Sequence, residues 1–154
     1  NWLNLRALVV RNTGISLSAF PDDVRSLAGR TAYDLTYLYE AQGNFRDLLK
    51  NSNSLISSYI RDYHLEDWII SVLGKTYRRL YDETLANADT NQHYHTERGN
   101  IPGYDISIEC TIRYHAIEGD CYDVNLQFII THLGYYHCNL LDTTIHYSAN
   151  PKRQ

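Results

Sequence analysis

The chain has 154 residues, of which 44% are hydrophobic and 21% charged, and its formal net charge is −4. This length fits a single domain that buries a sizeable core, and the composition excludes a disordered chain. Lysine and arginine together number 14, and no basic run extends beyond Arg78-Arg79. A groove that follows the phosphates of a nucleic acid needs clustered cations, so we expect no nucleic-acid partner.

Residues 1–20 form an irregular or apolar lead-in. Trp2, Leu5 and Leu8 fit a helical stripe, and the segment is too short to span a bilayer, although it could end a longer apolar helix. The chain starts with Asn1 and contains no methionine. We therefore expect a processed product, which a leader or a membrane anchor could precede. This start and the low lysine content slightly favour a secreted or extracytoplasmic location, whereas unpaired cysteines favour the opposite.

Residues 21–87 form the helical half, in which three amphipathic patterns predict about three helices. Pro21 and the two aspartates after it suit the start of the first helix, and Gly43 is expected to end it. The apolar stripe of this helix comprises Val24, Leu27, Ala28, Thr31, Leu35 and Leu38.

The second helix is expected to begin with Asn44 as its N-cap. A polar run at residues 50–54 interrupts its apolar stripe and can kink or divide it. The third helix covers Glu66 to about Leu85, with acidic residues at its start, where they interact favourably with the helix dipole. Gly74 inside it costs about 1 kcal/mol relative to alanine, which predicts a close packing contact at this position.

Residues 88–103 are expected to form a long loop between the helices and a sheet. His93, His95 and Glu97 alternate within it, and in an extended segment residues two apart point the same way. Imidazole and carboxylate groups bind zinc, so these three residues are a candidate metal site. The alternative is a solvated loop that holds two histidines by chance. The pattern alone favours this alternative, and no metal ligand is assigned.

Residues 104–147 predict an antiparallel meander. Two runs, Ile106–His115 and Tyr122–Thr131, alternate apolar and polar residues, as strands with one buried and one hydrated face do. A third strand follows from Tyr136, and Thr143–Tyr147 adds a short edge strand. The inward face is expected to carry Ile106, Ile108, Cys110, Ile112, Tyr114, Tyr122, Val124, Leu126, Phe128 and Ile130.

Two three-residue loops, Ile117–Gly119 and His132–Gly134, set the expected register of the meander. Each loop places glycine third, where a left-handed backbone conformation suits a residue without a Cβ. The first loop pairs Ile108 with Phe128, and the second pairs Phe128 with Cys138. Every inward residue then meets another inward residue, whereas a slip of one position would set apolar against polar side chains.

The three cysteines are expected to form no disulfide if the strand order is sequential. Cys110 and Cys138 face inward on the outer strands of the meander, about 9.5 Å apart. Bridged cysteines need Cα atoms within about 7 Å of each other. Cys121 points to the opposite face.

No constellation of residues predicts a reaction. His115 and His137 share the polar face, but on strands that are not neighbours. A surface ion pair is expected between Arg113 and either Asp123 or Glu109. The sequence lacks the phosphate-binding loop, the nucleophile elbow and the Cys-x-x-Cys motif. We therefore assign no catalytic residue, no cofactor and no metal ligand, and we lean against an enzyme.

The predicted fold is α+β, with about three N-terminal helices packed on one face of a C-terminal three- to four-stranded antiparallel meander. The same order of elements occurs in pilin-like subunits and, with extra strands, in NTF2-like cones, which is an analogy of fold alone. We expect a non-enzymatic interaction or assembly subunit, the soluble part of a processed, anchored or filament-forming protein that binds a protein partner or itself. The 14 tyrosines support this reading, because tyrosine offers amphipathic contact area.

The alternative function is that of a small-ligand or metal-binding domain, which could be an enzyme. Inward-facing tyrosines would be unusual in a dry core. Tyr114, Tyr122 and Tyr136 would line a pocket between the meander and the helices with hydroxyl groups, as in an NTF2-like cone.

Overall fold

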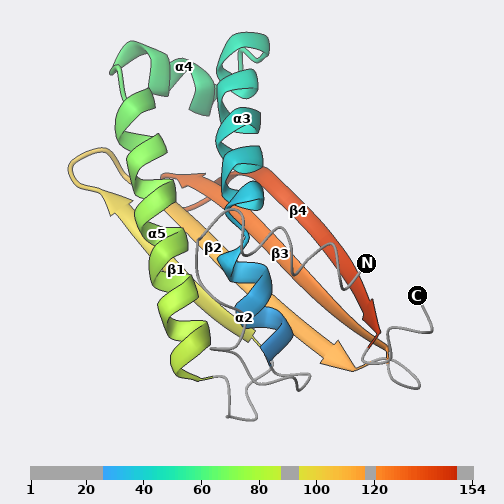
Figure 1. The fold of residues 1–154 in the computed structure, drawn as a ribbon. Helices are drawn as coiled ribbons and strands as arrows, with labels where there is room; N and C mark the ends of the chain where they lie inside the picture. Colours follow the sequence, from blue (N-terminus) through green and yellow to red (C-terminus); the bar gives the residue numbers. More distant parts are fainter. Residues whose placement is uncertain (1–25, 88–93, 117–120, 149–154) are drawn as a thin grey trace.

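The computed structural model describes residues 26–87, 94–116 and 121–148. Within these ranges, four helices are followed by a four-stranded antiparallel sheet with the sequential order β1-β2-β3-β4, and the helices cover one face of the sheet (Figure 1). The predicted α+β meander is therefore confirmed. The lead-in of the chain, the start of the first predicted helix and the Gly119 turn lie outside the described residues. The elements are α2 Ser26–Tyr33, α3 Leu35–Asn51, α4 Leu55–Asp62, α5 Glu66–Ala86, β1 Tyr94–Ile101, β2 Ile106–Ala116, β3 Cys121–His132 and β4 Tyr136–Ser148.

The sheet has one apolar and one polar face, as the period-two alternation predicts. The apolar face packs against α2, α3 and α5, and its central residues are completely buried. On the outer face, polar side chains pair across the strands: Arg98 with Glu109 at 2.6 Å, and Asn125 with Asp142 at 3.0 Å. The buried residues of β2 and β3 are Ile106, Ile108, Cys110, Ile112, Val124, Leu126, Phe128 and Ile130.

The predicted register is wrong by two residues, although the faces are right. Ile108 pairs with Ile130 instead of Phe128, because Ala116 rather than Tyr114 lies opposite Tyr122. At the second turn the loop is Leu133–Tyr135. Leu133 and Gly134 both have positive φ angles, so glycine occupies the middle position rather than the third. An offset of two keeps each side chain on its face.

Strand β4 is longer than predicted and contains a bulge. The register shifts between Phe128 and Ile129, so that Leu140 has no partner in the ladder and Leu141 lies opposite Phe128. Both leucines are buried. The predicted separate edge strand Thr143–Tyr147 is instead the continuation of β4, because a bulge bends a strand without ending it.

The first strand of the sheet, β1, was not predicted from the sequence. Residues 88–103 were expected to form a loop, but Tyr94–Ile101 forms β1 and pairs with β2 along its length. Gly99 explains how this polar strand is buried: a Cβ at that position would collide with Thr76 and lie 2.7 Å from Val72 Cγ1. Helix α5 therefore packs directly on the backbone of β1.

The first two helices divide at different positions from those predicted. Asp34 separates α2 from α3 and caps α3, since its side chain accepts a hydrogen bond from the Thr36 N–H at 3.0 Å. Gly43 and Asn44 lie inside α3 and neither ends nor begins a helix. The polar run at residues 50–54 does divide the helical pattern, because α3 ends at Asn51 and α4 begins at Leu55.

The third predicted helix is confirmed as α5, and its two acidic residues, Glu66 and Asp67, lie in the first turn. The predicted contact at Gly74 is wrong, because nothing lies within 4 Å of a Cβ built there. None of the described helices is both long and apolar enough to cross a membrane.

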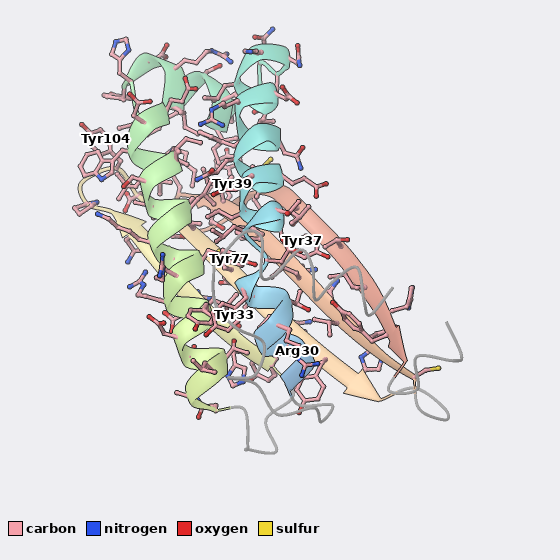
Figure 2. All side chains as sticks on the ribbon, in the orientation of Figure 1. Arg30, Tyr33, Tyr37, Tyr39, Tyr77 and Tyr104 are labelled. Atoms are coloured by element: carbon pink, nitrogen blue, oxygen red, sulfur yellow. The ribbon has the colours of Figure 1, made fainter. Side chains whose placement is uncertain are left out.

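Buried hydroxyl groups connect α2 to α5 and β4. The Tyr77 hydroxyl donates to the Thr31 carbonyl at 3.1 Å and lies 3.2 Å from the Asp34 carbonyl, where α2 ends. The Thr31 and Tyr147 hydroxyls lie 2.9 Å apart. Burial raises the pKa values of Tyr77 and Tyr147, so both hydroxyls remain protonated. In Figure 2, Tyr77 lies between the helices.

Candidate functional site

Seven aromatic rings gather at the end of the molecule where β1 turns into β2 and β3 into β4. We call this set the aromatic patch. It is built from four segments: α4, the start of α5 and the two turns (Figure 1). Its members are Tyr59, Tyr63, Trp68, Tyr104, His132, Tyr135 and Tyr136.

Ring contacts run continuously through the patch. Tyr59 contacts Tyr63 with ring centroids 4.7 Å apart and His132 at 4.2 Å. Tyr104 lies edge-on to Tyr63 at 5.7 Å and to Trp68 at 6.0 Å, and Figure 2 shows it beside the first turns of α5. Such tilted and edge-to-face pairs are the favoured geometries of aromatic rings. The rings therefore hold one another in place.

Three members of the aromatic patch are exposed to solvent in spite of these contacts. The exposed fractions are 54% for Tyr63, 45% for Trp68 and 64% for Tyr135. Leu133 in the β3–β4 turn adds a further exposed apolar side chain. Clusters of exposed aromatic residues mark interaction surfaces more often than single ones do. Exposed acidic residues lie close in sequence to members of the patch, namely Asp62, Glu66, Asp67 and Asp105.

Next to the patch, a groove with a volume of about 740 Å³ runs between α5 and β1. We call it the basic groove, because four of its lining residues are cations: Lys75, Arg78, Arg79 and Arg98. Trp68 lines one end of it, and Gly99 and Asn100 contribute from β1. The sequence reading found no clustered cations, because Arg98 is 19 residues away from Arg79 and joins it only through the packing of α5 on β1.

Two of the four cations have partners within the protein. Arg79 donates to the Arg98 carbonyl at 2.5 Å, and its Nε lies 3.9 Å from Glu97 Oε2. The Arg98 side chain pairs with Glu109 on the outer face of the sheet. Within the described part of the chain, Lys75 and Arg78 make no hydrogen bond or salt bridge to the protein. Their charges are available to a ligand.

A second hollow, of about 560 Å³, lies between α5 and the helices α2 and α3. Tyr33, Leu38, Tyr77 and Tyr81 line it, and the rings of Tyr33 and Tyr81 are in contact. Two of the three inward tyrosines that were expected to line a pocket, Tyr114 and Tyr136, lie elsewhere, and the side chain of Tyr122 lies outside the described part of the structure. Tyr114 packs on the core, and Tyr136 stacks on His132 in the aromatic patch.

Two of the three candidate metal ligands lie together, but on a strand rather than a loop. His95 and Glu97 lie on the inner side of β1, opposite Ile112 and Cys110, whereas His93 lies outside the described residues. Glu83 on α5 joins them, with its Oε1 3.7 Å from His95 Nδ1. Across the described ranges, no three His, Cys, Asp or Glu side chains are arranged to hold a metal ion.

This cluster consists of two half-buried carboxyl groups and one buried imidazole. Burial and a hydrogen bond with Glu83 raise the pKa of Glu97, against the opposing charge of Arg79. Burial lowers the pKa of His95, so that its imidazole is neutral near pH 7. Nδ1 of His95 and Oε2 of Glu83 are buried without a hydrogen-bond partner. The cluster therefore favours the protonated form of Glu97 and a neutral imidazole.

The remaining candidates are dispersed. Cys110 lies on β2 and Cys138 on β4 with β3 between them, as expected, and all three cysteines are free. His115 and His137 lie on the outer face of the same two strands. The expected ion pair of Arg113 is wrong, because Glu109 pairs with Arg98 and Asp123 pairs with His146.

Comparison of the chain with protein-family models, curated proteins and solved structures gives no match.

Proposed function

We propose that the chain is a non-enzymatic interaction or assembly domain that binds a protein partner, or a second copy of itself, through the aromatic patch. The observation that carries the proposal is the exposure of Tyr63, Trp68 and Tyr135 within one continuous set of ring contacts. Tyrosine and tryptophan dominate the binding energy of many protein interfaces, because they bury a large area with few rotatable bonds.

The charge around the patch suggests the chemistry of the segment that binds there. Asp62, Glu66, Asp67 and Asp105 are exposed and lie one or two residues from Tyr63, Trp68 or Tyr104 along the chain. Arg61, the cation nearest in sequence, is engaged by the backbone carbonyls of Leu49 and Ser52. An arginine or lysine of the bound segment would stack on the rings and face these carboxylates. A cationic segment therefore suits the surface better than an acidic one.

Two matched pairs of substitutions test the proposal. Tyr63→Ser with Tyr135→Ser removes rings from the patch, whereas Tyr39→Ser with Tyr94→Ser removes two tyrosines that are equally exposed, at 59% and 61%, but lie outside it. Light scattering across a concentration series measures self-association. Light scattering of mixtures with purified candidate partners measures binding to another protein. We expect wild type and the control pair to associate and the patch pair to lose the association. A strictly monomeric wild type without a partner, or equal loss in both pairs, contradicts the proposal.

A second candidate function is the binding of a small ligand between the helices and the sheet. The basic groove favours it, since it is within the size range of small-molecule sites and carries unpaired cations. A thermal-shift screen of small acids tests this function, and no increase in melting temperature with any of them would count against it.

A further inference from the structure

We propose that the basic groove binds a nucleoside polyphosphate, with the phosphates on Lys75 and Arg78 and the base on Trp68. This inference rests on the second candidate function and names its ligand class. It involves different residues from the protein interface, apart from Trp68, which lies at the junction of the aromatic patch and the groove.

The first argument is the local charge. The whole chain has a net charge of −4, yet four of its 14 lysines and arginines line this one groove. Lys75 and Arg78 are exposed and make no bond to other described residues, so no internal partner explains their position. An ammonium group and a guanidinium fork together match the oxygens of a phosphate chain. A cation cluster of this kind attracts anions to an otherwise acidic protein.

The second argument is the rigidity of the groove wall. Arg79 is held by the Arg98 carbonyl at 2.5 Å and by Thr76 Oγ1 at 3.5 Å. Gly99 brings β1 against α5 immediately beneath these groups. The backbone that carries Arg98 is thus fixed relative to the helix that carries Lys75 and Arg78. The floor of the groove therefore does not have to rearrange when a ligand binds.

The third argument is the spacing along α5. Lys75 lies seven positions after Trp68, which is about two helical turns and about 10 Å, so both side chains leave the same side of the helix. That distance matches the reach of a nucleoside polyphosphate from its base to its terminal phosphates. The Trp68 ring is 45% exposed, and an indole is a good platform for a base. Trp68 is the aromatic residue that lines the groove, so the site fits one nucleotide better than a strand, which needs successive rings and more cations.

Titration calorimetry with ATP at low salt and without divalent cations tests the site, supported by the fluorescence of Trp68. Lys75→Gln combined with Arg78→Gln is the test variant. Lys50→Gln combined with Arg113→Gln is the matched control, because these two cations are exposed on other surfaces. We expect the test variant to bind ATP at least about tenfold more weakly than wild type and the control variant to bind it normally. No binding of ATP, or equal affinity in all three proteins, overturns the proposal.

Further ligands separate the parts of the inference. We expect tripolyphosphate to bind more weakly than ATP, and Trp68→Leu to reduce the ATP affinity to that of tripolyphosphate. Equal affinities of ATP and tripolyphosphate for wild type would overturn the role of Trp68. A single-stranded oligonucleotide that binds far more tightly than ATP would overturn the single-nucleotide site. If small acids without phosphate raise the melting temperature and ATP does not, the small-ligand function stands and the nucleotide inference fails.

Discussion

Gly99 on β1 lies so close to Thr76 on α5 that no other residue fits between strand and helix without movement. Val72 closes the same contact, at 2.7 Å from the position of a Cβ at residue 99. This contact brings the polar strand β1 into the fold and forms the floor of the basic groove. It also holds His95 and Glu97 against α5.

We expect Gly99→Ala to destabilise the protein by about 1–3 kcal/mol, because an additional methyl group has to displace α5. Gly43→Ala is the control: nothing lies within 4 Å of its Cβ in the helix α3, so alanine should be neutral or stabilise by up to about 1 kcal/mol. Urea denaturation measures both. A destabilising effect of Gly43→Ala that equals that of Gly99→Ala would contradict the close contact.

Strand β1 could not be predicted from the sequence. The inward positions of β1 before Ile101 are His95, Glu97 and Gly99, none of which is an apolar side chain, so the strand carries no period-two hydrophobic signal. Its burial comes from α5, a tertiary contact. By contrast, β2 and β3 bury regular alternating apolar residues, and their faces were predictable from the pattern alone.

The predicted register of the strands and the predicted end of the first helix both rested on the positions of glycines, and both predictions were wrong. Gly134 has the positive φ angle that the prediction required, but Leu133 shares it, which moves the loop by one residue. Gly43 does not end a helix, because Ala41 and Phe45 continue the buried face of α3 across it. The conformational freedom of glycine permits a turn without requiring one.

Glu97→Gln is expected to change the dependence of stability on pH. The pKa of Glu97 is raised above its ordinary value of 4.5, so the carboxyl gains a proton on folding, and the fold loses stability as the pH rises from 4.5 through the raised value. Glutamine keeps a side-chain hydrogen bond to Glu83 without ionising. Relative to wild type, the variant should therefore gain stability between pH 4.5 and 7. Curves of unfolding free energy that stay parallel over this range would contradict the raised pKa of Glu97.

The pH dependence of His95 has the opposite sign. Its pKa is lowered from 6.5, so the unfolded chain binds the proton first and stability falls as the pH drops below 6.5. We expect this decline to be absent in His95→Gln. Denaturation of both proteins at pH 5 and pH 7.5 measures the difference. A His95 proton resonance that titrates at or above 6.5 in the folded protein would contradict the prediction.

Tyr77→Phe should cost about 1–2 kcal/mol, because it removes the hydroxyl that bonds to the carbonyls where α2 ends. The carbonyl acceptors are buried and lose a donor. Tyr39→Phe, at a hydroxyl-bearing ring that is 59% exposed, is the control and should change stability by less than about 0.5 kcal/mol. Equal effects of the two substitutions would show that the Tyr77 hydroxyl does not hold the α2–α3 junction.

Cys110 is expected to resist thiol reagents in the folded protein. Its side chain is fully buried on the apolar face, and burial raises the pKa of its thiol, which removes the reactive thiolate. Mass spectrometry after brief alkylation should find Cys110 modified at least about a hundredfold more slowly than in denaturant. Cys121 and Cys138, which are half-buried, should react sooner. Fast labelling of Cys110 would place it on the other face of the sheet.

The candidate surfaces were even less accessible to sequence reasoning than the fold. The number of tyrosines was visible, but their gathering was not, because the aromatic patch draws on four segments between Tyr59 and Tyr136. The basic groove likewise depends on the packing of α5 against β1. Only the alternation of His95 and Glu97 was readable in advance: it predicted that both point the same way from an extended segment of a loop, and both lie on one side of β1.

Hydroxyl-radical footprinting of the associated protein tests the central claim, that the aromatic patch is an interface. Tyr63 and Tyr135 are exposed in the single chain to about the same extent as Tyr39 and Tyr94. We predict that oxidation of Tyr63 and Tyr135 falls as the chain associates with itself or its partner, while oxidation of Tyr39 and Tyr94 stays constant. Protection of Tyr39 and Tyr94 with Tyr63 and Tyr135 still oxidised would contradict the account.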